Sequence, residues 1–163
     1  MMKVVYSDEA PSNDHHSIFL AGPTPRSPAV ESWRPEALEF LETIGWNGVV
    51  MVPEHRNGSA LASYDGQIEW EQTCLHACGK VVFWVPRDLN TMPAFTTNVE
   101  FGYWIARDNR KVMYGRPDSS PKNRYLDWMY HTHTGRTPAS SLRDLLTLTV
   151  GTFKNGLGTK ELE

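Results

Sequence analysis

The sequence has few cysteines, no long apolar run and no excess of positive charge. Its two cysteines, Cys74 and Cys78, are four residues apart on an expected helix, which is typical of two small buried side chains. We therefore expect a soluble protein in the reducing cytoplasm. No apolar run approaches the roughly 20 residues that span a bilayer, so no membrane association is expected. The net charge of -3, from 16 basic and 19 acidic side chains, gives no indication of nucleic-acid binding.

The sequence also lacks the short motifs of several enzyme classes. It has no P-loop, no GxGxxG fingerprint, no nucleophile elbow and no zinc-site spacing. Histidines are paired at His15-His16 and at His131-Thr132-His133, but no nearby cysteine or further spaced histidine completes a metal site. We therefore expect no metal and no cofactor. The N-terminal segment has no long apolar core, and no signal peptide is expected.

What the sequence does have is enough apolar residues, 40% of 163, for one compact domain spanning residues 1–163. Short apolar runs rich in β-formers predict strands at Ile18–Pro23, Val49–Pro53, Lys80–Pro86 and Lys111–Pro117. Strands that alternate with helical patterns predict an α/β fold with a parallel sheet, whose polar loops share one edge. Residues 1–17 are expected to form an arm or a short strand followed by a loop, and residues 130–163 a C-terminal helix and tail.

The helices are expected from apolar positions at three-and-four spacing. One begins after Ser32 and ends at Gly45, and a second covers Gln67–Cys78 after a polar loop at 59–66. Tyr125–Met129 suggests a short helix or 3₁₀ turn. The last helix should open with Thr137 as cap and Pro138 at its first position, and close at Asn155-Gly156, before a frayed tail from Leu157.

One carboxylate lies inside the apolar, aromatic segment that follows the third of these strands. This residue is Glu100, and we expect its helix to begin at Thr97, with Thr97 or Asn98 as N-cap, and to run to about Asp108. An acid in the first turn of such a helix lies where open α/β sheets bind ligands. The alternative is a glutamate that only complements the helix dipole. A functional role is favoured because apolar neighbours would desolvate the carboxylate and perturb its pKa.

A second acid, Glu71, lies on or beside the apolar stripe of the preceding helix, which we expect to contain Ile68, Cys74 or Leu75, and Cys78. Burying a glutamate costs several kcal/mol unless it has a partner or a function. Two carboxylates in different environments suit glycosidic chemistry, in which one attacks the anomeric carbon and the other handles the proton at the leaving group.

Polar groups that follow the strands are candidate substrate ligands. They are Gly22, Pro23, Thr24 and Arg26 after the first run, Glu54 after the second, Asn98 near Glu100, and Arg116 after the last. The Gly22–Pro28 loop suits an anion or a sugar, or it is simply a βα turn. Arg116 contacts an anionic or polyol ligand, or it is a surface charge.

Several of these segments together resemble the nucleoside 2-deoxyribosyltransferase-like family. The resemblance runs from about Ile18 to Trp128 and is strongest from Gln67 to Trp104. The segments that carry it are Ile18–Pro23, Gln67–Glu71, Phe83–Arg87, Thr97–Gly102 and Tyr114–Pro117.

The resemblance implies a five-stranded parallel sheet flanked by helices, in a flavodoxin/Rossmann-like arrangement. It implies that Glu100 is the nucleophile that forms a covalent deoxyribosyl intermediate. Glu71 takes the place of the acid, usually aspartate, that assists proton transfer at the base, and Gly22-Pro23-Thr24 lines the site. It also implies homo-oligomers, dimeric or larger, that act on a nucleoside or nucleotide and a free base.

Two positions depart from the family pattern. Phe19 replaces a tyrosine that hydrogen-bonds the nucleophile, and Pro93-Ala94-Phe95 replaces a region with a substrate-binding aspartate. Three hypotheses follow. The first is transfer of the sugar to another base. The second is hydrolysis of 2'-deoxynucleoside 5'-monophosphates, with Thr24, Arg26, Arg116 and Ser119 at the phosphate. The third is a silent nucleoside- or nucleotide-binding module.

Overall fold

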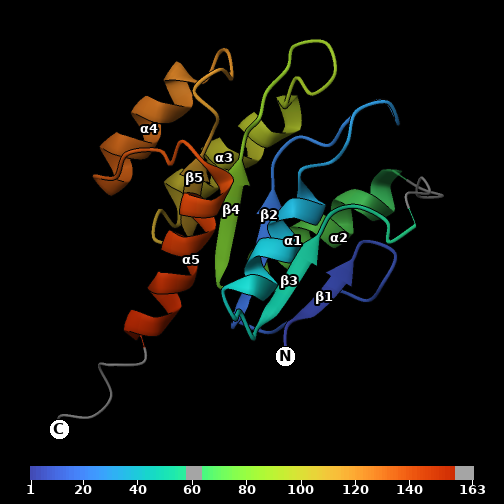
Figure 1. Ribbon diagram of the computed structural model, residues 1–163. Coiled ribbons are helices and arrows are strands. Elements are labelled where there is room, and N and C mark those ends of the chain that lie inside the picture. Colours follow the sequence, from blue (N-terminus) through green and yellow to red (C-terminus); the bar gives the residue numbers. More distant parts are fainter. Residues whose placement is uncertain (58–63, 157–163) are drawn as a thin grey trace, which may run out of the picture.

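The protein is built around one five-stranded parallel sheet in the strand order β1-β3-β2-β4-β5 (Figure 1). A computed structural model describes residues 1–57 and 64–156. The strands are β1 (Lys3–Tyr6), β2 (Ser17–Ala21), β3 (Val49–Val52), β4 (Lys80–Trp84) and β5 (Val112–Gly115). The helices are α1 (Arg34–Thr43), α2 (Tyr64–Ala77), α3 (Phe95–Arg107), α4 (Arg124–Thr134) and α5 (Leu142–Gly156). The expected α/β class, the single domain and the five-stranded parallel sheet are confirmed.

The four apolar runs of the sequence form the three inner strands and the edge strand β5, and the N-terminal segment supplies the other edge strand, β1. β1 pairs with β3 from Lys3 opposite Val49 to Tyr6 opposite Val52. β2 lies between β3 and β4, so the chain turns to one side of β2 after α1 and to the other side after α2. This reversal makes the carboxyl ends of β2 and β4 a topological switch point, which is where open α/β sheets bind ligands.

Helices cover both faces of the sheet, which explains why its strands are continuously apolar. α1 and α5 pack on one face, where their buried side chains meet Ile18, Leu20, Val50 and Val82. The other face, with Phe19, Val81 and Phe83, is covered by α2, α3 and α4. In Figure 1 this layering leaves the strand ends open at the upper edge, where the loops gather.

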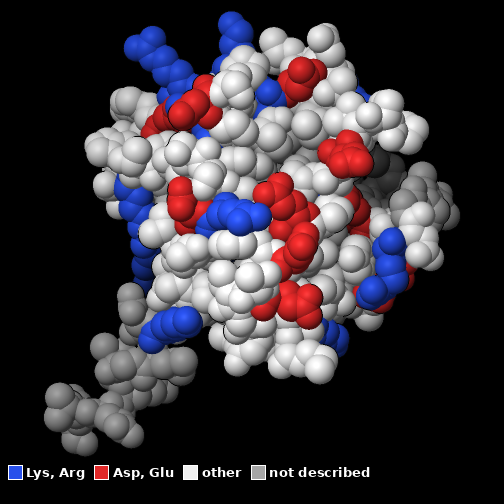
Figure 2. All heavy atoms as spheres, in the orientation of Figure 1, with Lys and Arg blue, Asp and Glu red and all other residues white. Residues whose placement is uncertain are grey.

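The outer surface carries charges of both signs. α1 has three exposed glutamates, Glu36, Glu39 and Glu42. Figure 2 shows acidic side chains over the middle of this face, with basic ones scattered among and around them, so this face offers no continuous positive surface to a polyanion. Within residues 1–57 and 64–156, no helix is both long and apolar enough to cross a membrane.

The helix boundaries differ from the sequence prediction where tertiary contacts set them. α1 ends as predicted, with Gly45 in the left-handed region at φ 76°. α2 begins earlier than predicted, at Tyr64; residues 58–63 of the expected polar loop lie outside the described residues. The prediction that Ile68 belongs to the buried stripe of α2 was wrong: Ile68 is 40% exposed, and Trp70 takes the buried position.

The start of α3 was also wrongly predicted. The helix begins at Phe95 after Ala94, which adopts φ 62° in the left-handed region, and no side chain caps it. Thr97 and Asn98 are therefore inside the helix rather than at its cap. Glu100 consequently lies in the second turn and not in the first, which weakens the alternative that it merely complements the helix dipole.

The C-terminal part corrects two further predictions. Tyr125–Met129 belongs to the first half of a full α-helix, α4, rather than to a short turn. Pro138 does not open α5, because Ala139 forms a parallel bridge to Gly115 and extends the sheet edge. α5 begins at Leu142 instead, where the Ser141 hydroxyl accepts a hydrogen bond from the main-chain amide of Asp144. The expected tail from Leu157 lies outside the described residues.

Candidate active site

A cleft of about 270 Å³ lies at the switch point, between the loop after β2 and the start of α3. The loop after β2 supplies one wall and the N-terminus of α2 another, while Pro93 to Thr97 form the third. Polar and charged residues that line the cleft include Thr24, Arg26, Arg34, Gln67, Glu71 and Thr97. The cleft therefore brings together residues that are far apart in the sequence.

Glu71 reaches the cleft from α2 and is half-buried. Its Oε1 accepts a hydrogen bond of 2.6 Å from Nε2 of Gln67, one turn earlier, and the same amide donates to the carbonyl of Pro53. Burial raises the pKa of Glu71, while the Gln67 hydrogen bond and the positive charge of Arg34 act in the opposite direction. Gln67 thus fixes the orientation of a carboxyl group that burial tends to keep protonated.

Glu100 lies on α3, one turn beyond Thr96 and Thr97, which line the cleft. Glu100 itself is not among the described residues that line the cleft. Helical side chains lean toward the N-terminus of their helix, and for α3 that is the end that lines the cleft. Burial raises its pKa from 4.5 to about 8; the negative charge of Glu71 adds to this shift and Arg34 opposes it. Glu100 is therefore a desolvated carboxyl group within electrostatic reach of Glu71.

The two acids behave as one coupled pair. Ionisation of either disfavours ionisation of the other, and burial raises both pKa values. At neutral pH the pair is expected to hold a proton, with the higher pKa on Glu100 in the ligand-free protein. A protonated acid paired with a carboxylate is the combination that glycosidic cleavage uses.

Comparison with known protein families shows which family the chain belongs to. A family described as nucleoside 2-deoxyribosyltransferase like matches residues 15–118, well over half of the sequence. The chain belongs to this family. The match includes β2 to β5 and both Glu71 and Glu100, and it confirms the resemblance seen in the sequence. None of the curated proteins compared with the chain matches it. Family membership indicates a nucleoside-modifying enzyme that binds a nucleoside substrate.

In this deoxyribosyltransferase-like protein, Gly22, Pro23, Thr24 and Arg26 all line the cleft, where the sequence analysis expected them. Gly22 is held at φ 138°, and a Cβ there would lie 2.1 Å from the carbonyl oxygen of Trp84. The loop can therefore pass against the end of β4 only because residue 22 has no side chain.

Arg34 is a residue of the cleft that sequence reasoning missed. It is 1% exposed, and its guanidinium donates to Leu20 O, Gly22 O, Thr24 Oγ1 and Glu54 Oε1. Glu54, a predicted substrate ligand, instead forms a 2.5 Å ion pair with Arg34. A possible signal was present, because an arginine at the start of a helix faces the positive end of the dipole and needs another reason to be there.

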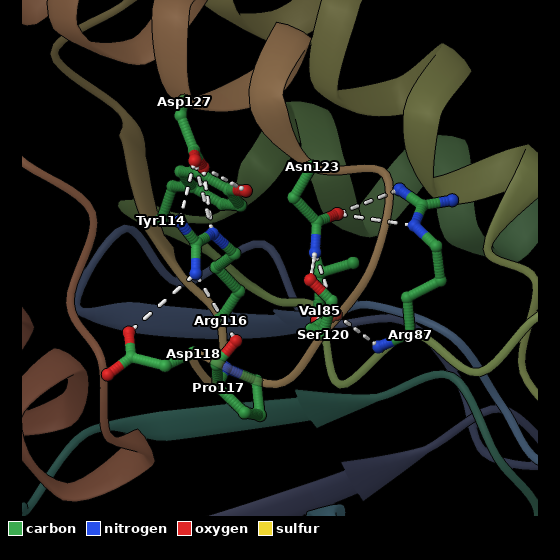
Figure 3. Close-up of polar contacts among 9 residues, drawn as sticks. All are labelled: Val85, Arg87, Tyr114, Arg116, Pro117, Asp118, Ser120, Asn123 and Asp127. Carbon is green, nitrogen blue, oxygen red and sulfur yellow. Dashed lines mark hydrogen bonds and ion pairs between the residues drawn. The ribbon is translucent and has the colours of Figure 1, made fainter.

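Asn98 is held by a second buried arginine, Arg87, which donates to its side-chain oxygen at 2.7 Å. Arg87 also donates to the carbonyl of Pro93 and to Oδ1 of Asn123. Figure 3 shows the Arg87 guanidinium directly against the Asn123 side chain. Arg87 thereby joins the loop after β4 to the N-termini of α3 and α4, and it fixes the segment of α3 that carries Glu100.

The structure does not bring Arg116 to the cleft. Its guanidinium forms a 2.7 Å ion pair with Asp127 of α4 and a longer one, 3.7 Å, with Asp118 (Figure 3). Asp127 also accepts a hydrogen bond from the Tyr114 hydroxyl. Neither Arg116 nor the exposed Ser119 is among the described residues that line the cleft. The Arg116 pair fastens α4 to the end of β5.

The histidine fragments stay separate from the cleft. His131 and His133 are exposed in the last turn of α4, and His16 stacks on Trp46. In the part of the chain that the structure describes, no group of three or more His, Cys, Asp or Glu side chains is arranged to hold a metal ion.

Proposed function

We propose that the protein cleaves the N-glycosidic bond of a (deoxy)nucleoside and transfers the sugar to another base, through a covalent glycosyl intermediate on Glu100. The observation that carries this proposal is that Glu100 and Glu71 are both desolvated carboxyl groups, and that the negative charge of Glu71 raises the pKa of Glu100 further. Membership of the deoxyribosyltransferase-like family supports the same chemistry.

In the first step, a carboxylate oxygen of Glu100 attacks C1' of the sugar and the C1'–N bond breaks. The electron pair of that bond stays with the base, whose ring nitrogen takes a proton from Glu71. In the second step, a nitrogen of the incoming base attacks C1', the Glu100 ester bond breaks, and Glu71 accepts the proton that the incoming base loses. Two displacements at C1' return the original configuration.

The position of the proton sets a pH dependence. Attack needs Glu100 ionised and departure of the base needs Glu71 protonated, whereas the ligand-free protein favours the proton on Glu100. Activity should therefore rise with pH as the pair loses its first proton and fall above about 8, where the pair loses its second. The expected result is a bell-shaped profile whose alkaline limb lies near 8 and whose acid limb lies above 4.5, the ordinary pKa of glutamate.

A second candidate, hydrolysis of a 2'-deoxynucleoside 5'-monophosphate, is favoured by the N-terminal end of α3. No side chain caps this helix, and Phe95, Thr96 and Thr97 of its first turn line the cleft. Thr97, which is 3% exposed, carries a hydroxyl in this lining. Arg26 lies nearby, over the Phe95 ring. Free amides, a hydroxyl and an arginine suit a phosphate group.

The experiment that separates these functions supplies deoxynucleosides, or their 5'-monophosphates, with and without a second free base. Base exchange that is lost in Glu100→Ala supports transfer. Free deoxyribose released at the same rate with or without acceptor would refute transfer as the main activity. A strict need for the 5'-phosphate, with KM raised in Arg26→Ala, supports the nucleotide hydrolase. If the protein binds a nucleoside or nucleotide without turning it over, and Glu100→Gln binds it equally well, only the hypothesis of a silent binding module would remain.

We also propose that the protein works as a homo-oligomer, a dimer or larger. α3 exposes an apolar stripe at Phe95, Val99 and Tyr103, which are 68%, 73% and 45% exposed, beside the cleft. Tyr125 and Trp128 of the neighbouring α4 are 72% and 59% exposed. Exposed apolar groups on adjacent helices are typical of protein interfaces. Light scattering after gel filtration tests this: a monomer at all concentrations would contradict it, and Val99→Glu should shift an oligomer toward monomer.

The cytoplasmic setting is likewise a proposal. Both cysteines are buried and free, as is usual for proteins of a reducing compartment.

A further inference from the structure

Ala94 is a strained residue in the wall of the cleft. It lies in the left-handed region at φ 62°, which a residue with a Cβ rarely adopts. It is 6% exposed, and it lines the cleft together with the rest of residues 93–97. Its carbonyl oxygen accepts the first helical hydrogen bond of α3, from the Asn98 amide at 3.1 Å. A strained conformation persists only where its surroundings hold it, so the segment on both sides of Ala94 must be fixed.

Arg87 holds this segment at both ends. Its Nη1 donates to the carbonyl oxygen of Pro93 at 2.5 Å, and its Nη2 donates to Oδ1 of Asn98 at 2.7 Å. Pro93 directly precedes Ala94, and Asn98 follows Ala94 by one helical turn. One planar guanidinium therefore spans the strained residue, with a fixed fork of donors that a lysine does not reproduce.

The guanidinium is itself fixed by Asn123, the residue before α4. Oδ1 of Asn123 accepts from Nε of Arg87 at 3.2 Å and from Nη2 at 3.1 Å. Nδ2 of Asn123 donates to Ser120 Oγ at 2.6 Å, and this hydroxyl donates to the carbonyl oxygen of Val85 (Figure 3). The amide orientation of Asn123 is thereby set with its oxygen toward Arg87. Arg87 is therefore held in place from a side that is not part of the cleft wall.

The position of Arg87 is unfavourable for a charge that serves stability alone. Arg87 is 6% exposed, and the oxygens that accept from its guanidinium are all neutral. It also meets the N-terminal ends of two helices, α3 at Asn98 and α4 at Asn123, whose dipoles disfavour a cation. Burying a charge without an opposite charge is costly. The geometry that Arg87 imposes on the cleft wall explains this arrangement better than a gain in stability does.

We propose that Arg87 is a positioning residue that keeps Ala94 in its left-handed conformation and thereby holds residues 93–97 in place as a wall of the cleft. Arg87 is not among the described residues that line the cleft, and it acts through Pro93 and Asn98. The inference rests on the proposed function for its catalytic meaning, because Glu100 follows Asn98 by two residues on the same helix. Its structural content can be tested without any substrate.

The test is hydrogen exchange of main-chain amides, measured by NMR and expressed as protection factors. The Asn98 amide reports directly, because its hydrogen bond to Ala94 closes the first turn of α3. Arg87→Met removes the clamp and should lower the protection of the amides of residues 98–100 about tenfold or more, as expected for loss of a hydrogen bond to a charged group. Amides of the central strand β2 report global opening, so the local loss is measured relative to them.

Two further variants separate positioning from a general loss of stability. Ala94→Gly, introduced into the Arg87→Met protein, removes the Cβ that makes φ 62° unfavourable, so it should return part of the lost protection. Arg110→Met is the matched control, because it removes the ion pair of an exposed arginine with Asp108 at the opposite end of α3. This control should leave the protection of residues 98–100 unchanged.

A local loss of protection in Arg87→Met, with partial return in the double variant, would support the proposal. Equal losses in α3 and β2, an equal loss in Arg110→Met, or no return with Ala94→Gly would overturn it. If Arg87→Met does not fold, Arg87→Lys takes its place in the same comparisons, since it keeps the charge and loses the fork of donors.

The failure of this inference and the failure of the proposed function can be told apart, because hydrogen exchange needs no turnover. A wild-type protein that turns over no nucleoside or nucleotide would refute the proposed function, and the predicted exchange pattern would still support the positioning role of Arg87. If the wild-type protein is active, kcat/KM should fall in Arg87→Lys and should partly recover when Ala94→Gly is added.

Discussion

Replacing Glu100 by glutamine should stabilise the protein while it removes activity. The pKa of Glu100 is raised by burial from 4.5 to about 8, so the folded state keeps a proton that the unfolded chain loses. Stability is therefore undiminished below the unfolded pKa and falls as pH rises from about 4.5 to about 8. Each pH unit in that window costs about 1.4 kcal/mol, which gives a penalty of about 3 kcal/mol near neutral pH.

The glutamine side chain in Glu100→Gln cannot ionise, so this variant avoids the loss of stability that ionisation of Glu100 causes. Urea unfolding of both proteins across this pH range should give nearly equal free energies of unfolding at the acid end. The variant should be more stable by about 3 kcal/mol near neutrality, or roughly 6–12 °C in Tm for a domain of this size. Glu69→Gln, at an exposed position of the same molecule, is the matched control and should show no such trend. A stability difference that does not change with pH would refute the desolvation of Glu100.

Three further substitutions test the surroundings of the site. Gly22→Ala should destabilise the protein by at least about 2 kcal/mol in urea unfolding, because a Cβ would lie 2.1 Å from the Trp84 carbonyl oxygen. Lys111→Met should lower Tm and cost about 1–2 kcal/mol, since the ammonium donates to two carbonyls at the end of α2. Arg116→Ala should cost about 1 kcal/mol through loss of the Asp127 pair. KM should not change in this variant, and a large rise would show that Arg116 contacts the substrate.

The sheet could be predicted from the sequence because its strands are short apolar runs between turn residues. Lys80–Trp84 and Val112–Gly115 are buried on both faces, so burial and pattern agree. The β1 strand was harder to recognise, since its burial pattern is mixed at the sheet edge. Fold class therefore follows from local sequence, while the edge strand depends on pairing with β3.

Helix starts were predicted poorly where long-range contacts override local signals. Thr137-Pro138 has the sequence of a helix start, yet Ala139 pairs with Gly115 and delays α5. Thr97 resembles an N-cap, yet α3 begins two residues earlier, after the left-handed Ala94. In each case a contact with the sheet or a strained residue, which no local pattern reveals, sets the boundary.

The two acids could be proposed from the sequence because Glu100 lies in an apolar stretch and Glu71 lies on or beside an apolar helical stripe. Arg34 could not be found in this way, because its partners come from the ends of β2 and β3 and from two helices on the opposite face of the sheet. For Arg116 the sequence prediction was misleading. Its loop position suggested a ligand contact, but its guanidinium is paired with Asp127, eleven residues later. Which side chain an arginine pairs with depends on the fold, and a short sequence motif does not reveal that pairing.

The central claim is that Glu100 becomes covalently bonded to the sugar of a nucleoside. The most direct test is intact-mass analysis after incubation with a panel of deoxynucleosides and deoxynucleotides, followed by peptide mapping. We predict a mass increase of one deoxyribosyl group, or its 5'-phosphate, on the peptide that contains Glu100, and none in Glu100→Gln. An adduct on another residue, or turnover of substrate in Glu100→Gln at the wild-type rate, would contradict it.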